Sequence, residues 1–183
     1  KAIALAFDFP WTNKTLFYDQ YVENKSFFEN SLLSADGLPS PTEEEFFKNL
    51  QAKFKDAVPS EVFTQPMGYL SLSQPIKKRM VQASKLLQEA GYSLKDGILS
   101  KGSSKLEFRF LLSSPTWGRI VEPFIKNLKR IGVAATIEIE ESSVYQKRLQ
   151  GREFDMTVLK IGQSQSPGNE QIDFWHSSSA EEK

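Results

Sequence analysis

The pattern that most constrains the fold is the alternation of strand-like and helix-like segments in the second half of the chain. Three apolar segments, residues 106–112, 133–139 and 154–161, have the length and composition of strands. About 20 to 28 residues separate the starts of consecutive strands, which leaves room for a helix in each crossover. The three strands are therefore expected to be parallel in an α/β fold, where ligands bind beyond the carboxyl ends of the strands.

Helical patterns accompany these strands. Residues 76–90 carry apolar side chains at helical spacing and are followed by Gly91, which can end a helix. Residues 115–131 form a second stripe that stops at Gly132, and a short third helix is expected at residues 143–149. The residues of the second stripe that are expected to face inward are Trp117, Ile120, Val121, Phe124, Leu128 and Ile131.

The strand at residues 133–139 differs from the other two because polar residues interrupt it. Ile137 and Ile139 alternate with Glu138 and Glu140, so one face of the sheet is expected to be partly solvated and this strand to lie near an edge. Two carboxylates on one face can also serve as general acid and base. A catalytic α/β domain, such as a hydrolase using Glu138 and Glu140, is therefore an alternative to a solvated strand face.

The first 75 residues read as a helical and irregular segment. Residues 1–7 have the pattern of the middle of an amphipathic helix, so the chain is expected to be a fragment of a longer protein. The helices expected in this segment run from Asp8, as N-cap, to about Tyr21, over residues 26–34, and from Ser40 to about Ala57, with Ser40 and Glu43 forming a capping box.

The composition excludes several kinds of site. The chain contains no cysteine, which excludes disulfides, thiolate metal sites and a cysteine nucleophile. A single histidine, His176, leaves no basis for a multi-histidine metal site or a Ser-His-Asp triad. The glycine-rich phosphate-binding motifs are also missing. We therefore expect neither a cofactor nor a metal.

Charge is balanced overall but uneven along the chain. The 23 basic and 23 acidic residues cancel, whereas residues 77–130 hold a net charge of +8. Such a segment is typical of nucleic-acid binding. Its cations, however, fall on the polar faces of two predicted helices, without an RNA-binding or helix-turn-helix signature. No nucleic-acid partner is expected, and a nucleic-acid module is the third and weakest hypothesis.

A polar loop follows the last predicted strand. Residues 162–169 carry no charge and are rich in amide and hydroxyl side chains. Such side chains both donate and accept hydrogen bonds, which suits the recognition of peptide amides or sugars. An ordinary polar loop is the other interpretation.

Several stretches together resemble the family 5 extracellular solute-binding proteins of ABC importers. They are KAIALAFDFPWTN at residues 1–13, ASKLLQEAGY at 83–92, NLKRIGV at 127–133 and FDM at 154–156. The Yej-type binders of this family, which are associated with oligopeptides and microcin C, are similar in four more stretches. These are FENS at 28–31, GLPS at 37–40, VFT at 62–64 and GQSQSPGNEQ at 162–171.

The resemblance implies one lobe of a periplasmic-binding-protein-like receptor of type II. Residues 1–183 would form this single lobe, with residues 1–75 packed on a βαβαβ core at 76–175 that contains a mixed sheet, and residues 176–183 beginning a connection. The receptor would be a non-catalytic, periplasmic component of an oligopeptide importer. It would capture a peptide or peptide-like ligand between this lobe and a missing lobe and deliver it to permease subunits. The fragment itself would be monomeric.

The resemblance also implies a set of ligand-binding residues: Thr116, Trp117, Tyr145, Ile161, Gly162, Gln163, Ser164, Gln165 and Asn169. Trp117 and Tyr145 fit core positions equally. Peptide binders of this family usually carry Trp at the position of Ile161 and, at that of Ser164, an Asp that pairs with the amino terminus of the peptide. Without that carboxylate, neutral hydrogen bonds or the missing lobe would hold the ligand.

Overall fold

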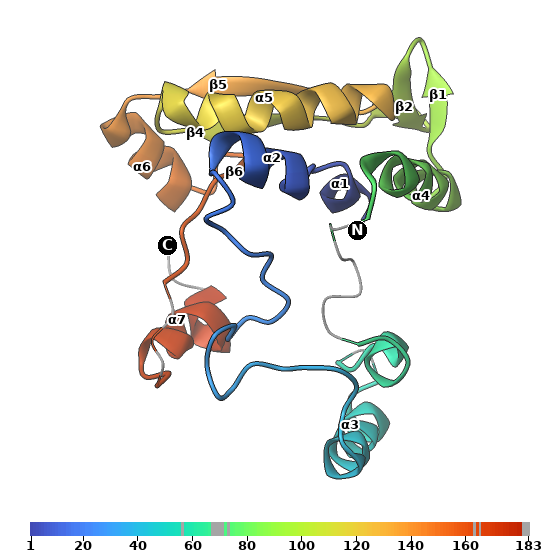
Figure 1. Ribbon diagram of the computed structural model, residues 1–183, viewed down its shortest axis with the longest axis vertical. Coiled ribbons are helices and arrows are strands. Elements are labelled where there is room, and N and C mark those ends of the chain that lie inside the picture. Colours follow the sequence, from blue (N-terminus) through green and yellow to red (C-terminus); the bar gives the residue numbers. More distant parts are fainter. Residues whose placement is uncertain (56, 67–71, 73, 163, 165, 181–183) are drawn as a thin grey trace. The chain divides into compact units, whose positions relative to one another are not determined.

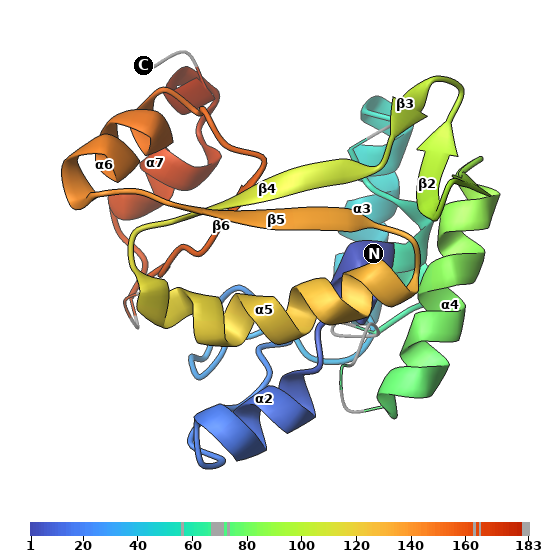
Figure 2. The ribbon, with the colours of Figure 1, turned by 90° about the horizontal axis from the view of Figure 1, so that it is seen from above.

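Three parallel strands form the sheet that organises the larger part of the structure. β4 (Glu107–Leu112) lies in the middle, between β5 (Ala134–Ile139) and β6 (Met156–Thr157). Both pairings are parallel, which confirms the expected α/β arrangement (Figure 2). β5 lies at an edge, as its alternating sequence predicts. The third strand is shorter than residues 154–161 because only Met156 and Thr157 pair with β4.

The computed structural model describes residues 1–55, 57–66, 72, 74–162, 164 and 166–180, and the chain divides into two units. Unit 1 comprises Lys1–Tyr21, Leu72–Gly162 and Pro167–Lys183 and contains the parallel sheet. Unit 2 comprises Val22–Ser71 and Gln163–Ser166. The expectation that residues 1–183 form one lobe stays a prediction.

One long helix covers one face of the parallel sheet. α5 (Pro115–Arg130) buries Val121, Phe124 and Leu128, and the ring of Phe124 lies 5.8 Å from that of Phe110 in β4 (Figure 2). The apolar stripe in the sequence thus becomes the contact between helix and sheet. The inward position expected for Trp117 is wrong, because Gly118 is the buried residue of that turn and Trp117 is 36% exposed.

A glycine with a positive φ ends α5 at the point where an antiparallel meander approaches it. Gly132 has a φ of 81°, and a Cβ there would lie 2.8 Å from the side chain of Leu94. Its carbonyl accepts a hydrogen bond from the Leu99 amide at 2.7 Å. The meander consists of β1 (Ser93–Lys95), β2 (Ile98–Lys101) and β3 (Ser104–Lys105). Gly132 therefore provides both the helix stop and the space for the meander.

A buried arginine holds the N-terminal helices against α4 (Ile76–Glu89). The guanidinium of Arg79, 1% exposed, donates to the carbonyls of Leu5, Phe7 and Gln74 and pairs with Asp8 at 3.1 Å. The first two carbonyls lie at the end of α1 (Ala2–Leu5), next to α4 in Figure 1. Asp8 is the N-cap residue of α2 (Phe9–Leu16), as expected, but its side chain makes no capping hydrogen bond because it pairs with Arg79.

Two helix predictions in the N-terminal third fail because of local hydrogen bonds. α2 ends at Leu16 instead of near Tyr21, since the side chain of Asn13 bonds the backbone N–H and carbonyl of Tyr21 across a turn. Residues 26–34 form successive turns in place of a helix, and Asn30 has a φ of 64° there. Short polar side chains of this kind compete with helical backbone bonds.

Unit 2 contains the helix that the capping box predicts. α3 (Pro41–Lys53) begins with the reciprocal bonds of Ser40 and Glu43, and it ends four residues before the expected Ala57. The Ser40 hydroxyl, and then its backbone N–H, lower the pKa of the Glu43 carboxyl. A short 3₁₀ helix, η1 (Ser60–Phe63), follows.

The remaining helices belong to unit 1. They are α6 (Ser142–Gln150), α7 (Glu170–Trp175) and the 3₁₀ helix η2 (Ser177–Ala180). α6 confirms the short helix expected after the second strand. None of the helices in the described ranges combines the length and apolar composition needed to cross a membrane.

Replacement of Arg79 by methionine should destabilise the protein strongly. R79M removes the donors of three carbonyls and the partner of Asp8 while it keeps most of the side-chain volume. A loss of about 2–3 kcal/mol is expected, because the Leu5 carbonyl stays buried without its donor and three partly buried groups lose theirs. Urea unfolding measures it. The matched control is K78M, on the exposed side of α4, which should change the unfolding free energy by less than about 0.5 kcal/mol. Equal effects would contradict the assignment.

Candidate functional site

The candidate site lies where the parallel strands of unit 1 end. β4 leads into α5, β5 leads into α6, and β6 leads into residues 158–162, which are neither helix nor strand. Because the strands are parallel, these three connections begin at one edge of the sheet (Figures 1 and 2). This carboxyl edge is where open α/β sheets bind ligands.

Thr116 and Trp117 lie at this edge, in the first turn of α5. The Ser114 hydroxyl accepts a hydrogen bond from the Thr116 backbone N–H at 3.2 Å, and this bond caps the start of the helix. Thr116 is exposed, and Trp117 presents about a third of its surface to solvent. The structure thus leaves Trp117 available for contact with a ligand.

Tyr145 behaves differently, because it is 6% exposed and belongs to the core. Its hydroxyl lies 3.0 Å from the Thr157 hydroxyl and 3.4 Å from the Val158 carbonyl. Thr157 in turn donates to the Leu111 carbonyl at 2.8 Å. This chain of bonds fixes α6 against the end of β6, so Tyr145 positions the segment that follows.

The segment after β6 exposes both backbone and side chains. Leu159 and Ile161 are about half exposed, and a Cβ on Gly162 would meet no atom within 4 Å. Within the described part of the chain, residues 159–162 make no backbone hydrogen bond. Directly beyond the sheet, these residues thus present donors and acceptors that no other described residue engages.

The polar loop is only partly described. Gln163 and Gln165 lie outside the described residues. Ser164 belongs to unit 2 and donates its hydroxyl proton to the Ser166 carbonyl at 2.7 Å. Asn169 is the exposed residue before α7. The structure thus ties Tyr145 to the end of β6 and places Thr116 and Trp117 after the neighbouring strand, and all of these ligand-binding assignments stay predictions.

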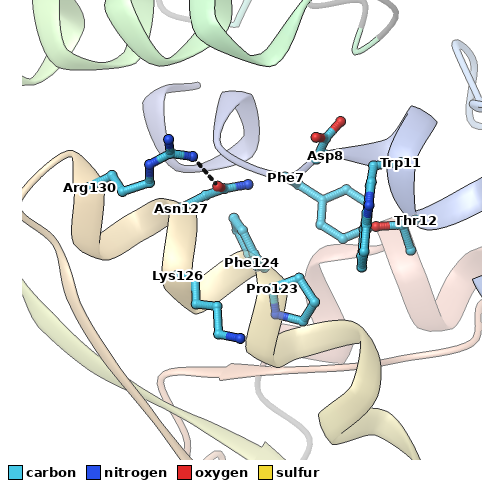
Figure 3. A pocket seen from close by; sticks show the side chains of 9 residues that line it. All are labelled: Phe7, Asp8, Trp11, Thr12, Pro123, Phe124, Lys126, Asn127 and Arg130. Carbon is cyan, nitrogen blue, oxygen red and sulfur yellow. Dashed lines mark hydrogen bonds between the residues drawn. The ribbon is translucent and has the colours of Figure 1, made fainter. Parts of the chain in front are cut away.

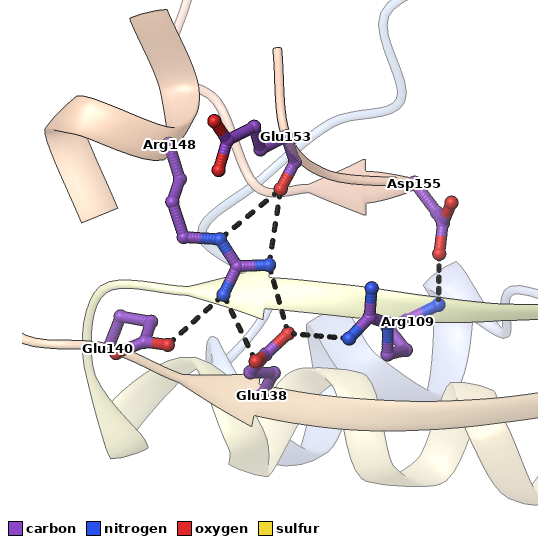
Figure 4. A network of polar contacts seen from close by, with 6 residues as sticks. All are labelled: Arg109, Glu138, Glu140, Arg148, Glu153 and Asp155. Atoms are coloured by element: carbon purple, nitrogen blue, oxygen red, sulfur yellow. Dashed lines mark hydrogen bonds and ion pairs between the residues drawn. The ribbon is translucent and has the colours of Figure 1, made fainter. Parts of the chain in front are cut away.

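Sequence reasoning missed a cluster of ion pairs on the sheet face opposite α5 (Figure 4). Arg148 of α6 lies 3.0 Å from carboxylate oxygens of both Glu138 and Glu140, and it donates to the Glu153 carbonyl. Arg109 of β4 lies 3.4 Å from Glu138. Two carboxylates side by side on one strand face are the sequence signal for such a cation.

The cluster gives no support to the hydrolase alternative. The hydrogen bond from Arg148 lowers the pKa of the Glu138 carboxyl, and the charges of Arg148 and Arg109 add to this effect. A general acid needs the opposite shift, toward protonation at neutral pH. Glu138 and Glu140 instead hold α6 to the sheet. Over the described residues, no group of three or more His, Asp or Glu side chains could hold a metal ion.

Comparison with known proteins finds relatives among the bacterial solute-binding proteins. The family model of the bacterial extracellular solute-binding proteins, family 5 Middle, matches residues 1–183. The probable peptide-binding protein YejA of Agrobacterium fabrum is 39% identical over 185 residues, which cover 99% of this chain and 30% of that protein. The chain spans about three tenths of the length of the curated relatives that it matches.

Solved structures share the fold. The oligopeptide-binding protein AppA of Bacillus subtilis, solved in complex with a nonapeptide, has a TM-score of 0.62 and 22% identity over 97% of this chain and 30% of its own. The oligopeptide-binding protein OppA has a TM-score of 0.62 and 19% identity over 97% of this chain and 23% of its own. These likenesses confirm the periplasmic-binding-protein-like α/β fold.

The ion pairs of Glu138 predict a specific dependence of stability on pH. Because the folded state lowers the pKa of this carboxyl, its contribution is present above the ordinary glutamate pKa and is lost as pH falls through the lowered value. E138Q should therefore lose less stability than the wild type between pH 6 and pH 3, measured by urea unfolding. The control E107Q changes an exposed residue on the same sheet face, which has no ion-pair partner among the described residues. An E138Q profile parallel to the wild-type profile would contradict the prediction.

Proposed function

Since this chain belongs to the family 5 bacterial extracellular solute-binding proteins, we propose that it forms part of the peptide-binding component of an ABC importer. Its relative from Agrobacterium fabrum is named a probable peptide-binding protein, which supports this ligand class. The nonapeptide bound to AppA supports it as well. The protein binds and releases its ligand unchanged, in the periplasm, and passes it to the permease subunits.

The exposed segment beyond β6 is the observation that carries the proposal. Residues 159–162 present backbone groups without partners among the described residues. An extended peptide can pair with such groups as an added strand. Backbone pairing recognises any peptide, because every residue except proline has the same donor and acceptor. Importers of mixed oligopeptides need this kind of recognition.

The side chains around this segment define the proposed site. Thr116 and Trp117 contact the ligand from α5, while Tyr145 holds the segment in place. The remaining contacts come from Ile161, Gly162, Gln163, Ser164, Gln165 and Asn169. With Ser164 in place of a carboxylate, the site holds the peptide by neutral hydrogen bonds and does not require a free amino terminus. Such tolerance is compatible with peptide-like ligands, and microcin C stays a prediction within this class.

Two lobes close around the ligand, and this chain supplies one of them. The chain spans about three tenths of the length of its relatives, so other parts of the protein provide the opposite wall. Ligand recovery tests the proposal: the intact protein is purified from its host periplasm, denatured, and its released ligands are identified by mass spectrometry. Peptides are the expected result. Recovery of sugars or metal complexes without peptides would overturn the proposal.

Replacement of Trp117 by alanine should weaken peptide binding by the intact protein. A partly exposed indole at an interface typically contributes enough for a loss of about tenfold in affinity. Isothermal titration with a recovered peptide measures the change. Trp11 of α2 is the matched control, because W11A removes another half-exposed indole outside the proposed site. If W117A and W11A bind the peptide equally well, Trp117 is not part of the site.

A further inference from the structure

Apart from the proposed peptide site, unit 1 has a cavity between the junction of α1 with α2 and the C-terminal half of α5 (Figure 3). The junction is anchored on α5 at two points. The ring of Phe7 meets that of Phe124 edge-on at 5.4 Å, and the Ala6 carbonyl accepts the Asn127 amide at 3.1 Å. Next to these anchors the facing side chains line an open cavity of about 460 Å³. This volume falls in the range of small-molecule sites.

Aromatic side chains form the wall of this cavity. In Figure 3 the indole of Trp11 stands beside the ring of Phe7, and Pro123 and Phe124 of α5 lie on the other side of that ring. Trp11 is 45% exposed, whereas Phe124 is buried. A tryptophan that is half exposed in a cavity wall offers a flat apolar surface against which a planar ring can stack.

The rim of the cavity carries positive charge without compensation. Lys126 and Arg130 lie one helical turn apart on α5, and neither has an ion-pair partner among the described residues. The Asn127 side chain accepts a hydrogen bond from Arg130 at 3.4 Å and so directs the guanidinium (Figure 3). Asp8 is the acidic residue of the lining, and Arg79 already pairs with it. The local field therefore favours an anion.

We propose that this cavity binds small aromatic carboxylates. The ring stacks on the exposed part of the Trp11 indole, and the carboxylate contacts Lys126 and Arg130 at the rim. This ligand class contacts both the indole and the cations of the cavity. An apolar ring alone would make no ion pair, and a simple anion would make no contact with the indole. The cavity does not overlap the proposed peptide site: Trp117 lies six residues before Pro123 along α5, roughly 9 Å at 1.5 Å per residue.

A matched pair of probes tests the proposal on the intact protein. 2-Naphthoate and 2-naphthamide have the same ring, but only the first is charged. Ligand-observed NMR and calorimetric titration should show saturable binding of both, with 2-naphthoate about fivefold tighter, as expected for contacts with exposed cations. The double variant K126Q/R130Q should abolish this preference, and W11A should weaken both probes.

Two controls make the result decisive. K129Q removes an exposed cation of α5 that does not line the cavity, and it should leave both affinities unchanged. Thermal unfolding of each variant establishes that it is folded. The proposal is overturned if the wild type binds neither probe saturably, if it binds the two equally, or if K126Q/R130Q behaves as K129Q does. Peptide titration of the same variants separates this site from the proposed peptide site, because only the naphthalene probes should respond.

Discussion

The hydrogen bonds of the buried Arg79 guanidinium hold α1 and the start of α2 against α4, and much of unit 1 depends on this contact. Backbone carbonyls at the end of α1 point into the protein, where no helical partner remains for them, and the guanidinium from α4 satisfies two of these carbonyls together with Asp8. This arrangement sets the direction in which the chain leaves α1. Phe7 then contacts Phe124 of α5, and Phe124 in turn packs on Phe110 of the parallel sheet. The helical layer and the sheet are therefore connected through a polar contact as well as through apolar packing.

The sequence allowed the sheet to be predicted because periodicity is a local signal. Strands at β4 and β5, their parallel pairing and the edge position of β5 all follow from apolar spacing and crossover length. The failures have a different origin. Asp8 stands at the N-cap of α2 but its side chain does not cap the helix, because Arg79, 71 residues away, binds its carboxylate. The helix expected at residues 26–34 was wrong because Ser26 bonds the amides of Phe28 and Ala35, and such side-chain bonds outweigh weak helical patterns.

The candidate site, too, was predicted where the signal was local and missed where it depended on contacts between distant elements. Parallel strands placed it at the carboxyl edge, and the family resemblance selected the individual residues. The burial of Tyr145 could not be read from its position, because it depends on a hydrogen bond to Thr157 on another element. The Arg148 cluster was missed for the same reason, although Glu138 and Glu140 on one strand face already required a cation. α6 is thus held at two points, by Tyr145 against the end of β6 and by Arg148 against the glutamates of β5, and these contacts support the exposed segment that follows β6.

In the proposed function, this chain supplies one wall of a peptide site whose other wall lies elsewhere in the protein. Calorimetric titration of the intact protein and of residues 1–183 alone, with the same peptide, tests it most directly. If half of a micromolar binding energy comes from this chain, about −4 of −8 kcal/mol, the chain alone should bind near millimolar. A site with two walls predicts micromolar binding by the intact protein and no affinity tighter than about 100 μM for residues 1–183. Equal micromolar affinities, or no peptide binding by the intact protein, would contradict it.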